Sequence, residues 1–429
     1  MTIHQTISQL ANQCVLCGIC IPHCPTYAIF RTENESPRGR ISLFKALAEA
    51  QFEPADELLI SLDHCLGCLA CEKICPSQVD YTQISRLGRE LVHRQYPVHK
   101  RALKQKFIEK VLVTASVHPL LKLAAKTLSP FQSLLSKQSH TAFIGNFSRE
   151  ISADSSQALP LQEFYPASGY PGLHAQSSLH SKPKAQVILF KGCSGDLFEQ
   201  KVLKDIIVLL NTCLIDVVIP EHQQCCGAIS IRQGDAETMQ TLARQNINSF
   251  KSLLQESQAV ISINNSCSAH LKEYKHLIDD SEAEEFSRKS VDAIAFLAHT
   301  IKSGNIQFSP LNDNKIGVHV PCSLKNSLKE ETLLFDLLEH IPGIQLSKLN
   351  DKFCCGAAGS YMLQYLEVAN QLLDDKIEEI ADKHYTTIVS SNIGCSLHFK
   401  QGLEKQDAIP AREIEVIHPI RLLARQLKR

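Results

Sequence analysis

Two similar cysteine runs near the start of the chain constrain its fold more than any other feature. The segments CVLCGICIPHCP and CLGCLACEKICP both follow the pattern C-x2-C-x2-C-x3-C-P. Three closely spaced thiolates can surround one face of an iron–sulfur cube, and this spacing is typical of [4Fe–4S] sites. Zinc sites usually pair two shorter C-x2-4-C knuckles, so the runs favour iron–sulfur clusters over zinc or disulfides.

The fourth cysteine of such a run normally reaches the other cluster. We therefore expect one cluster on Cys14, Cys17, Cys20 and Cys75, and a second on Cys65, Cys68, Cys71 and Cys24. The segment SPRGR lies between the runs. Ser36 and Pro37 fit a helix start, with Ser36 as its cap. Alternatively, Arg38 and Arg40 offset cluster charge or orient a partner.

The remaining cysteines, among 17 in all, indicate a tandem duplication. Four of them recur at offsets of 129, 129, 129 and 128 residues, so that Cys193, Cys225, Cys226 and Cys267 correspond to Cys322, Cys354, Cys355 and Cys395. Short apolar runs at 185–190, 216–220 and 259–264 alternate with helical patterns, and the order recurs at 316–320, 344–349 and 386–391. This alternation predicts parallel strands with helical crossovers in each repeat.

In each repeat the cysteines follow predicted strands or precede a helix. Loops at the carboxyl ends of parallel strands converge, so we expect one cysteine site per repeat. Gly227 and Gly356 would allow close backbone approach in the two Cys-Cys-Gly segments. His270 and His398 lie one helical turn beyond Cys267 and Cys395 and are either further ligands or ordinary buried polar residues.

Other candidates lack a pattern of partners. We expect Cys213 to be a buried structural thiol, and His222 and His319 to have surface or loop roles. The basic stretch 86–106 reads as a solvated helix face, or as a surface that docks on an acidic partner or an anionic membrane.

Composition excludes some function classes. The 44 Lys and Arg residues balance 45 Asp and Glu residues and Trp is absent, so we expect no nucleic-acid partner. The start of the chain lacks a signal-peptide pattern, and no apolar run reaches the roughly 18–20 residues of a membrane span. We expect a cytoplasmic protein, either free or attached peripherally to the inner face of the cell membrane through its complex. So many thiols in a reducing compartment indicate metal ligands or redox groups.

The predicted fold class is α+β and multi-domain. A mainly α-helical, bacterial ferredoxin-like domain for two [4Fe–4S] clusters is expected at 1–110. A helical segment and a Ser/Pro-rich linker follow at 111–184, and tandem α/β repeats with parallel strands occupy 185–305 and 306–429. No Gly-rich fingerprint for FAD or NAD is found. We expect no catalytic residues for substrate oxidation in this chain.

Taken together, these segments resemble the iron–sulfur subunits of glycolate oxidase. The likeness rests on the two runs, on SPRGR between them, and on HVPCSLKN, FCCGAAGSYMLQ and SNIGCSLHF. The repeats resemble the cysteine-rich CCG domains of heterodisulfide reductase, which can bind a non-cubane [4Fe–4S] cluster through five cysteines. The fifth of these, in C-x2-C, is replaced here by His270 and His398. The resemblance allows a further iron–sulfur cluster in one or both repeats.

The resemblance also implies a function. FAD-containing partner subunits would oxidise glycolate to glyoxylate, or D-lactate to pyruvate, and this chain would pass the electrons to a quinone or another membrane-linked acceptor. Alternatives are an iron–sulfur subunit of a lactate-utilisation or anaerobic glycerol-3-phosphate dehydrogenase complex, a heterodisulfide reductase-like enzyme, or a structural metal-binding module.

Overall fold

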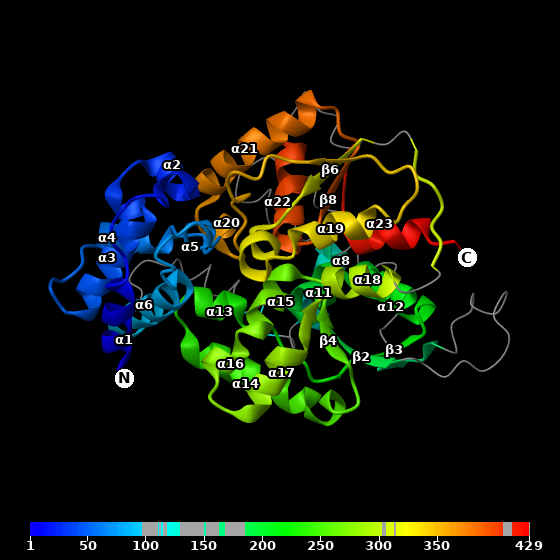
Figure 1. The fold of residues 1–429 in the computed structure, drawn as a ribbon, viewed down its shortest axis with the longest axis horizontal. Coiled ribbons are helices and arrows are strands. Elements are labelled where there is room, and N and C mark those ends of the chain that lie inside the picture. The colour runs from blue at the N-terminus through cyan, green and yellow to red at the C-terminus, as the bar shows by residue number, and fades with distance from the viewer. Residues whose placement is uncertain are drawn as a thin grey trace.

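The computed structural model describes residues 1–96, 110, 113–114, 118–128, 150–151, 163–167, 185–302, 306–312, 315–405 and 414–428. A helical N-terminal domain lies at one end of the molecule, and two α/β units occupy the rest (Figure 1). The predicted fold class is thus confirmed. Among the described residues, no helix is long and apolar enough to cross a membrane.

The N-terminal domain consists of short helices around the two cysteine runs. They are α1 (Ile3–Ala11), α2 (Pro25–Phe30), α3 (Pro37–Ala48), α4 (Asp56–Asp63), α5 (Ala70–Lys73) and α6 (Tyr81–Gln95), with 3-10 turns at Ile21–His23 and Glu33–Glu35. Ser36 caps α3 by accepting a hydrogen bond from the Gly39 amide at 2.9 Å, and Pro37 opens the helix, as predicted. Buried Ile7, Phe44 and Ile84 hold α1, α3 and α6 together.

The first repeat is built on a five-stranded sheet of order β1-β3-β2-β4-β5. Its strands are β1 (Phe164–Tyr165), β2 (Ala185–Phe190), β3 (Ile215–Val218), β4 (Ala259–Ser262) and β5 (Ser290–Asp292), and only β1 pairs antiparallel in this sheet. The helices are α11 (Gly192–Phe198), α12 (Gln200–Thr212), α13 (Ala228–Arg232), α14 (Ala236–Leu254), α15 (Asn265–Lys272), α16 (Tyr274–Leu277), α17 (Ser281–Lys289) and α18 (Ala293–Lys302).

The second repeat has a four-stranded parallel sheet of order β7-β6-β8-β9. Its strands are β6 (Ile316–His319), β7 (Leu346–Lys348), β8 (Thr387–Ser390) and β9 (Glu415–Ile417). Its helices are a π-helix η7 (Ser323–Leu328), α19 (Glu331–Leu338), α20 (Tyr361–Gln364), α21 (Leu366–Asp382), α22 (Ile393–Glu404) and α23 (Pro419–Gln426). The strand order repeats that of β3-β2-β4-β5, as a duplication requires. The helical stretch that follows the second Cys-Cys-Gly segment is broken at Tyr365, between α20 and α21.

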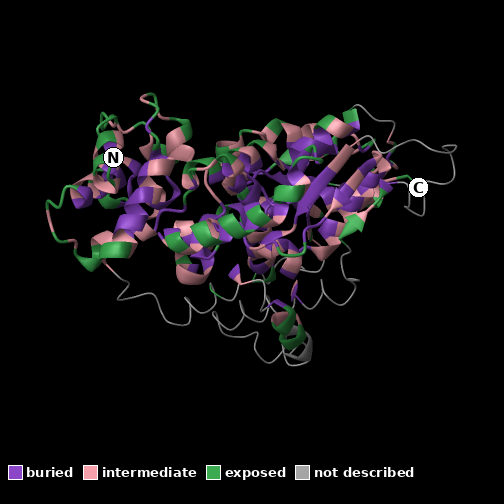
Figure 2. Ribbon diagram, turned by 90° about the horizontal axis from the view of Figure 1, so that it is seen from below, coloured by how far each residue is buried: buried purple, intermediate pink, exposed green. Residues whose placement is uncertain are grey.

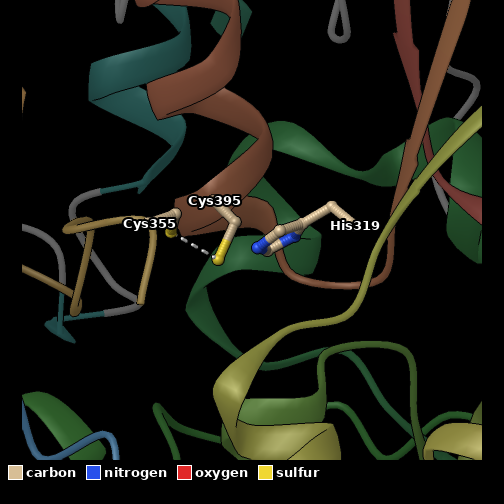
Figure 3. A group of neighbouring side chains, drawn as sticks. All are labelled: His319, Cys355 and Cys395. Carbon is tan, nitrogen blue, oxygen red and sulfur yellow. Dashed lines mark hydrogen bonds between the residues drawn. The ribbon is translucent and has the colours of Figure 1, made fainter. Parts of the chain in front are cut away.

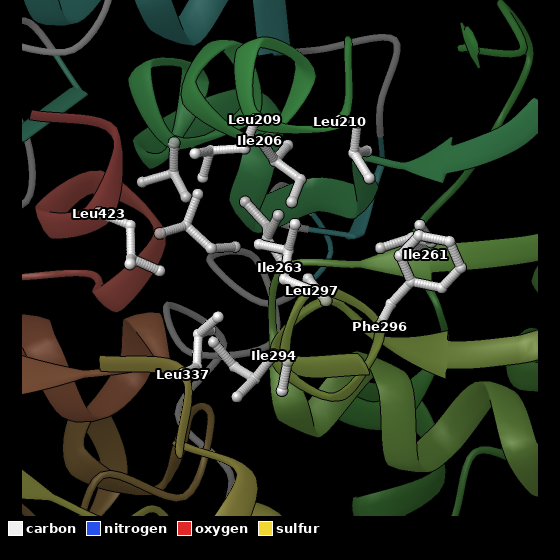
Figure 4. Packing of buried hydrophobic residues seen from close by; sticks show 14 of the residues in the cluster. Ile206, Leu209, Leu210, Ile261, Ile263, Ile294, Phe296, Leu297, Leu337 and Leu423 are labelled. Carbon is white, nitrogen blue, oxygen red and sulfur yellow. The ribbon is translucent and has the colours of Figure 1, made fainter. Parts of the chain in front are cut away.

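One apolar core spans both repeats. Figure 4 shows Ile206 and Leu209 of α12 facing Leu423 of α23, with Ile294 of α18 close to Leu337 of α19. The strands are mostly buried, while the helices that cover them are exposed on their outer faces (Figure 2). Removing this much apolar surface from water is the main force that joins the two repeats.

The repeats also meet through equivalent polar residues at the starts of two helices. Asn264 caps α15 and Asn392 caps α22. The Asn392 amide nitrogen lies 3.4 Å from Asn264 Oδ1 and donates to Ser266 Oγ at 2.7 Å. Because the two asparagines occupy corresponding positions, their contact marks a local pseudo-twofold axis between the repeats.

The segment between the N-terminal domain and the first repeat is described only in part. Helix α8 (His118–Leu128) lies in the region 111–184, in which the sequence predicts a helical segment. His118 Nδ1 and Lys122 Nζ each lie 2.9 Å from the Asp196 carboxylate, so α8 is tied to α11 of the first repeat. Most of the predicted Ser/Pro-rich linker at 152–184 lies outside the described residues. The predicted domain boundaries stay predictions.

Candidate metal centres

All 17 cysteines lie in the described part of the chain, and none of them forms a disulfide. Sixteen of them make up the four predicted ligand groups, two in the N-terminal domain and one in each repeat. Buried thiols without disulfide partners are the chemistry that thiophilic metals and iron–sulfur clusters require.

The first predicted cluster site is a pocket in the N-terminal domain. Its walls include all four predicted ligands, Cys14, Cys17, Cys20 and Cys75. Burial, the largest effect, raises the pKa of the Cys20 thiol to about 11. The Arg38 guanidinium also lines this pocket and donates to the Leu16 carbonyl oxygen at 2.9 Å. This position supports the expectation that Arg38 offsets negative charge there.

The second predicted site lies around Cys24, Cys65, Cys68 and Cys71. The charges of Cys68, Cys65 and Cys24 all act on the Cys71 thiol, whose pKa is raised first by burial and then by these neighbours. The structure therefore brings the four sulfurs into one neighbourhood. Their division into two ligand sets stays a prediction.

A buried cation serves this second site. Arg40 is 1% exposed, pairs with Glu35, and lies 3.7 Å from Cys24 Sγ through Nη1. Burial opposes ionisation of Cys65, but Arg40 and Arg89 outweigh it and lower the pKa of that thiol. The helix start is thus confirmed, whereas the positions of Arg38 and Arg40 beside the two cysteine groups support the charge-offset alternative, which stays a prediction.

Sequence reasoning missed Tyr81, which begins α6. Its hydroxyl donates to Cys65 Sγ at 3.4 Å, and hydrogen bonds to ligand sulfurs tune a cluster's potential. Its position just after the second cysteine run was the only available signal.

The first-repeat site brings its four cysteines together, as predicted, but only Cys225 and Cys226 lie in a loop, since Cys193 and Cys267 lie in the first turns of α11 and α15. Cys193 Sγ lies 3.5 Å from Cys225 Sγ, and Cys226 Sγ lies 3.4 Å from Cys267 Sγ. Hydrogen bonds from Cys193 and Cys226 lower the pKa of Cys225, which favours the thiolate that binds metals. Gly227 has φ +89°, which a side chain would strain.

The second-repeat site has the same plan. Cys355 Sγ lies 3.1 Å from Cys395 Sγ, and Cys322 Sγ lies 3.9 Å from Cys354 Sγ. Hydrogen bonds from Cys322 and Cys355 lower the pKa of Cys354. Both four-cysteine groups are thus assembled by the fold, and their role as ligands stays a prediction.

The expectation for His319 is wrong. This residue ends β6 and is only 4% exposed, and its ligand atom lies within 4.8 Å of the sulfurs of Cys355 and Cys395. Figure 3 shows its ring pointing at the Cys395 sulfur. Burial lowers its pKa to about 3, so the imidazole is neutral at pH 7. A single histidine on a buried strand gave no spacing signal.

The histidines predicted from C-x2-H occupy a different place. His398 is fully buried, and neither ring nitrogen has a well-formed hydrogen bond. Its pKa is lowered to about 4 by burial, while the Cys355 backbone acts in the opposite direction. His270 is partly buried, and its Nε2 lies 3.6 Å from where a Cβ on Gly227 would stand. Both histidines therefore lie next to the backbone of the Cys-Cys-Gly loops.

The N-terminal domain docks directly on the second-repeat site. Cys68 and Leu66 pack in the same apolar cluster as Cys354 and Cys355. The charge of Cys354 acts on the Cys68 thiol, and that of Cys68 on the Cys322 thiol. The Asn326 amide of η7 donates to the Cys68 carbonyl oxygen at 2.7 Å, which fixes this contact.

A second joint connects the N-terminal domain to the first repeat. Arg89 of the basic stretch is buried and donates to the carbonyl oxygens of Cys65 at 2.7 Å and of Arg232. The basic stretch is therefore not simply a solvated face, and residues 97–106 of it lie outside the described part. Cys213 is partly buried against the main core, and His222 is exposed, as expected for a surface residue.

Comparison with known proteins matches this arrangement. The family model described as a 4Fe-4S dicluster domain matches residues 10–79, and the model described as a cysteine-rich (CCG) domain matches twice, at 187–272 and 316–400. The chain therefore joins one dicluster domain to two cysteine-rich domains. The dicluster match supports iron–sulfur clusters in the N-terminal domain.

Two relatives are similar over nearly the whole length. The chain is 29% identical to a probable glycolate oxidase iron–sulfur subunit of Bacillus subtilis, with 95% of both chains covered. It is 27% identical to the glycolate oxidase iron–sulfur subunit of Escherichia coli, over 91% of this chain and 89% of that one. Lactate utilization protein A of Shouchella clausii is 29% identical but covers only 55% of this chain.

Proposed function

We propose that this chain is the electron-transfer subunit of a glycolate oxidase complex. The observation that carries the proposal is the similarity, over 89–95% of each chain, to two glycolate oxidase iron–sulfur subunits. When bound, [4Fe–4S] clusters would supply one-electron transfer, which suits a carrier between a flavin and an acceptor. Partner subunits containing FAD would oxidise glycolate, or D-lactate, and a quinone or another membrane-linked acceptor would take the electrons.

The chain's own residues suit a carrier. The two N-terminal cysteine groups share one small domain, and Cys68 of the second group packs beside Cys354 of the second repeat. Arg38 and Arg40 place positive charge against the N-terminal groups, which favours the more negative, reduced state of bound clusters. These features support a chain of neighbouring redox sites that leads into the second repeat.

A lactate-utilisation subunit is the second candidate, since lactate utilization protein A is also similar to this chain. That protein aligns with 55% of this chain, whereas the glycolate oxidase subunits align with more than 90%. The length of the likeness therefore favours glycolate oxidase.

The test is coexpression with candidate flavoprotein subunits, followed by anaerobic purification. We expect glycolate-dependent dye reduction that requires every subunit and is lost in Cys68→Ser. The matched control is Cys213→Ser, which removes a cysteine outside the four groups. Activity with D-lactate or glycerol 3-phosphate but not glycolate would favour the alternative complexes. Heterodisulfide reduction by the isolated chain would refute the proposal.

A further inference from the structure

The two cysteine sites differ at one position that the duplication makes directly comparable. Phe190 ends β2 and His319 ends β6, and the two are 129 residues apart, the same offset as the cysteines. The strand registers agree, because Phe190 pairs with Ser262 and His319 with Ser390. One repeat therefore presents an aromatic ring where the other presents an imidazole.

The imidazole of His319 is held as a metal-binding histidine would be. Its Nδ1 lies 3.0 Å from Ser390 Oγ, and its ring packs edge-on against Phe399 at 4.9 Å between centroids. With Nδ1 engaged by the hydroxyl, Nε2 is the nitrogen left for the sulfurs of Cys355 and Cys395 (Figure 3). A hydrogen bond that fixes the far nitrogen is the usual support of a ligating histidine.

Phe190 can play no such part in the first repeat. It packs in an apolar cluster with Phe250, whose ring centroid is 6.0 Å away, and it carries no donor atom. The first-repeat site therefore consists of Cys193, Cys225, Cys226 and Cys267 without an equivalent imidazole on the strand. His319 is preferred to His398 and His270 as the candidate, because among the described residues it is the histidine whose ligand atom lies within 4.8 Å of two cysteine sulfurs.

We propose that His319 is a metal ligand through Nε2, so that the second repeat holds a mixed histidine–cysteine centre and the first repeat does not. The sulfur ligands would be Cys355 and Cys395, completed by Cys322 and Cys354. Imidazole and thiolate together suit iron or zinc, so the shared chemistry is a thiophilic transition-metal centre. The inference concerns this chain's own site and does not depend on glycolate as the substrate.

The mixed ligand set has an electronic consequence if the metal is iron. Compared with a site of five thiolates, as in the heterodisulfide reductase type, a site in which a neutral imidazole takes one ligand position is less negative and has a higher potential, as in clusters where histidines replace cysteines. The centre beside Cys68 would then attract electrons from the N-terminal domain more strongly than an all-thiolate site. The two repeats would have different roles despite their common origin.

The experiment uses the full chain, purified anaerobically, with His labelled by 15N. Iron, zinc and acid-labile sulfide per chain first establish which metal is present. Pulsed EPR of the reduced protein then detects histidine nitrogen on an iron centre, and X-ray absorption at the zinc edge detects it on zinc. We expect a nitrogen signal in the wild type and its loss in His319→Phe, which copies the residue of the first repeat.

Three variants keep the result decisive. His319→Cys should retain the metal without the nitrogen signal, even if His319→Phe folds poorly. His398→Phe and Phe190→His should keep the wild-type signal from the second repeat. A nitrogen signal that persists in His319→Cys, or that disappears in His398→Phe, would overturn the proposal. Glycolate-dependent activity plays no part in this readout, so the proposed function can fail independently.

Discussion

The two Cys-Cys-Gly loops make a matched pair for one test. Gly227 and Gly356 have nearly the same φ, +89° and +86°, so alanine at either position adopts a left-handed conformation that costs roughly 1–2 kcal/mol. Their surroundings differ. A Cβ at Gly356 would stand 2.6 Å from the backbone oxygen of Ala369 in α21, whereas at Gly227 the nearest atom is Cγ of the flexible Met239 side chain at 3.1 Å.

The clash at Gly356 sets the expected difference in loop stability between the two alanine variants. Relieving it at Gly356 requires a shift of backbone, and overpacking of this kind costs about 1–3 kcal/mol beyond the strain. Gly356→Ala should therefore destabilise its loop by about 1–3 kcal/mol more than Gly227→Ala does, a factor of roughly 5–150 in local opening. The second-repeat cysteines should lose their arrangement first.

Hydrogen exchange followed by mass spectrometry measures this effect. We expect faster exchange of amides 353–362 in Gly356→Ala than of amides 224–233 in Gly227→Ala, each relative to the wild type. Gly67→Ala is the control for strain alone, because Gly67 has φ +64° and no atom within 4 Å of its Cβ position. Equal exchange in the two loops, or a larger effect at Gly227, would refute the steric reasoning.

Three further predictions concern buried polar groups. Tyr81→Phe removes the hydrogen bond to Cys65 Sγ and should lower the potential of a cluster there by on the order of 50 mV, measured by redox titration with EPR; an unchanged potential would contradict it. Arg40→Met leaves Glu35 buried without its partner and should cost about 3–5 kcal/mol, visible as a lower unfolding temperature that Arg40→Met/Glu35→Gln partly restores. Burial raises the pKa of Asp292 from 3.8 to about 6, so the folded state binds the proton more tightly and stability should fall by up to about 3 kcal/mol as pH rises from 4 to 6. In Asp292→Asn, the free energy of unfolding measured by urea denaturation should depend less on pH between 4 and 6. A pH dependence that survives the substitution would exclude this carboxyl as its source.

The features that sequence predicted are those with a repeated or periodic signal. Two cysteine runs and four matched offsets indicated the domain types, and apolar runs placed β2, β4, β6 and β8 within about two residues. The short strands β5 and β9 were not predicted because their three-residue sequences, SVD and EVI, each contain an acidic residue and form no apolar run. The position of His319 beside two cysteines was not predicted, because it depends on where β6 ends relative to loops that are distant in sequence. Arg89 escaped because a basic helix gives no sign of which side chain turns inward.

The contact between Asn264 and Asn392 bears on how the duplicated architecture arose. Each asparagine organises the start of the helix that carries one cysteine of its own repeat, and each is completed by the other repeat. A lone repeat would leave this polar edge and the adjoining apolar core uncovered. We expect such a repeat to associate with a second copy about the same axis, which light scattering would detect as a dimer. The ancestor of this chain would then have been a homodimer, and fusion allowed the two halves to diverge, as they do at Phe190 and His319.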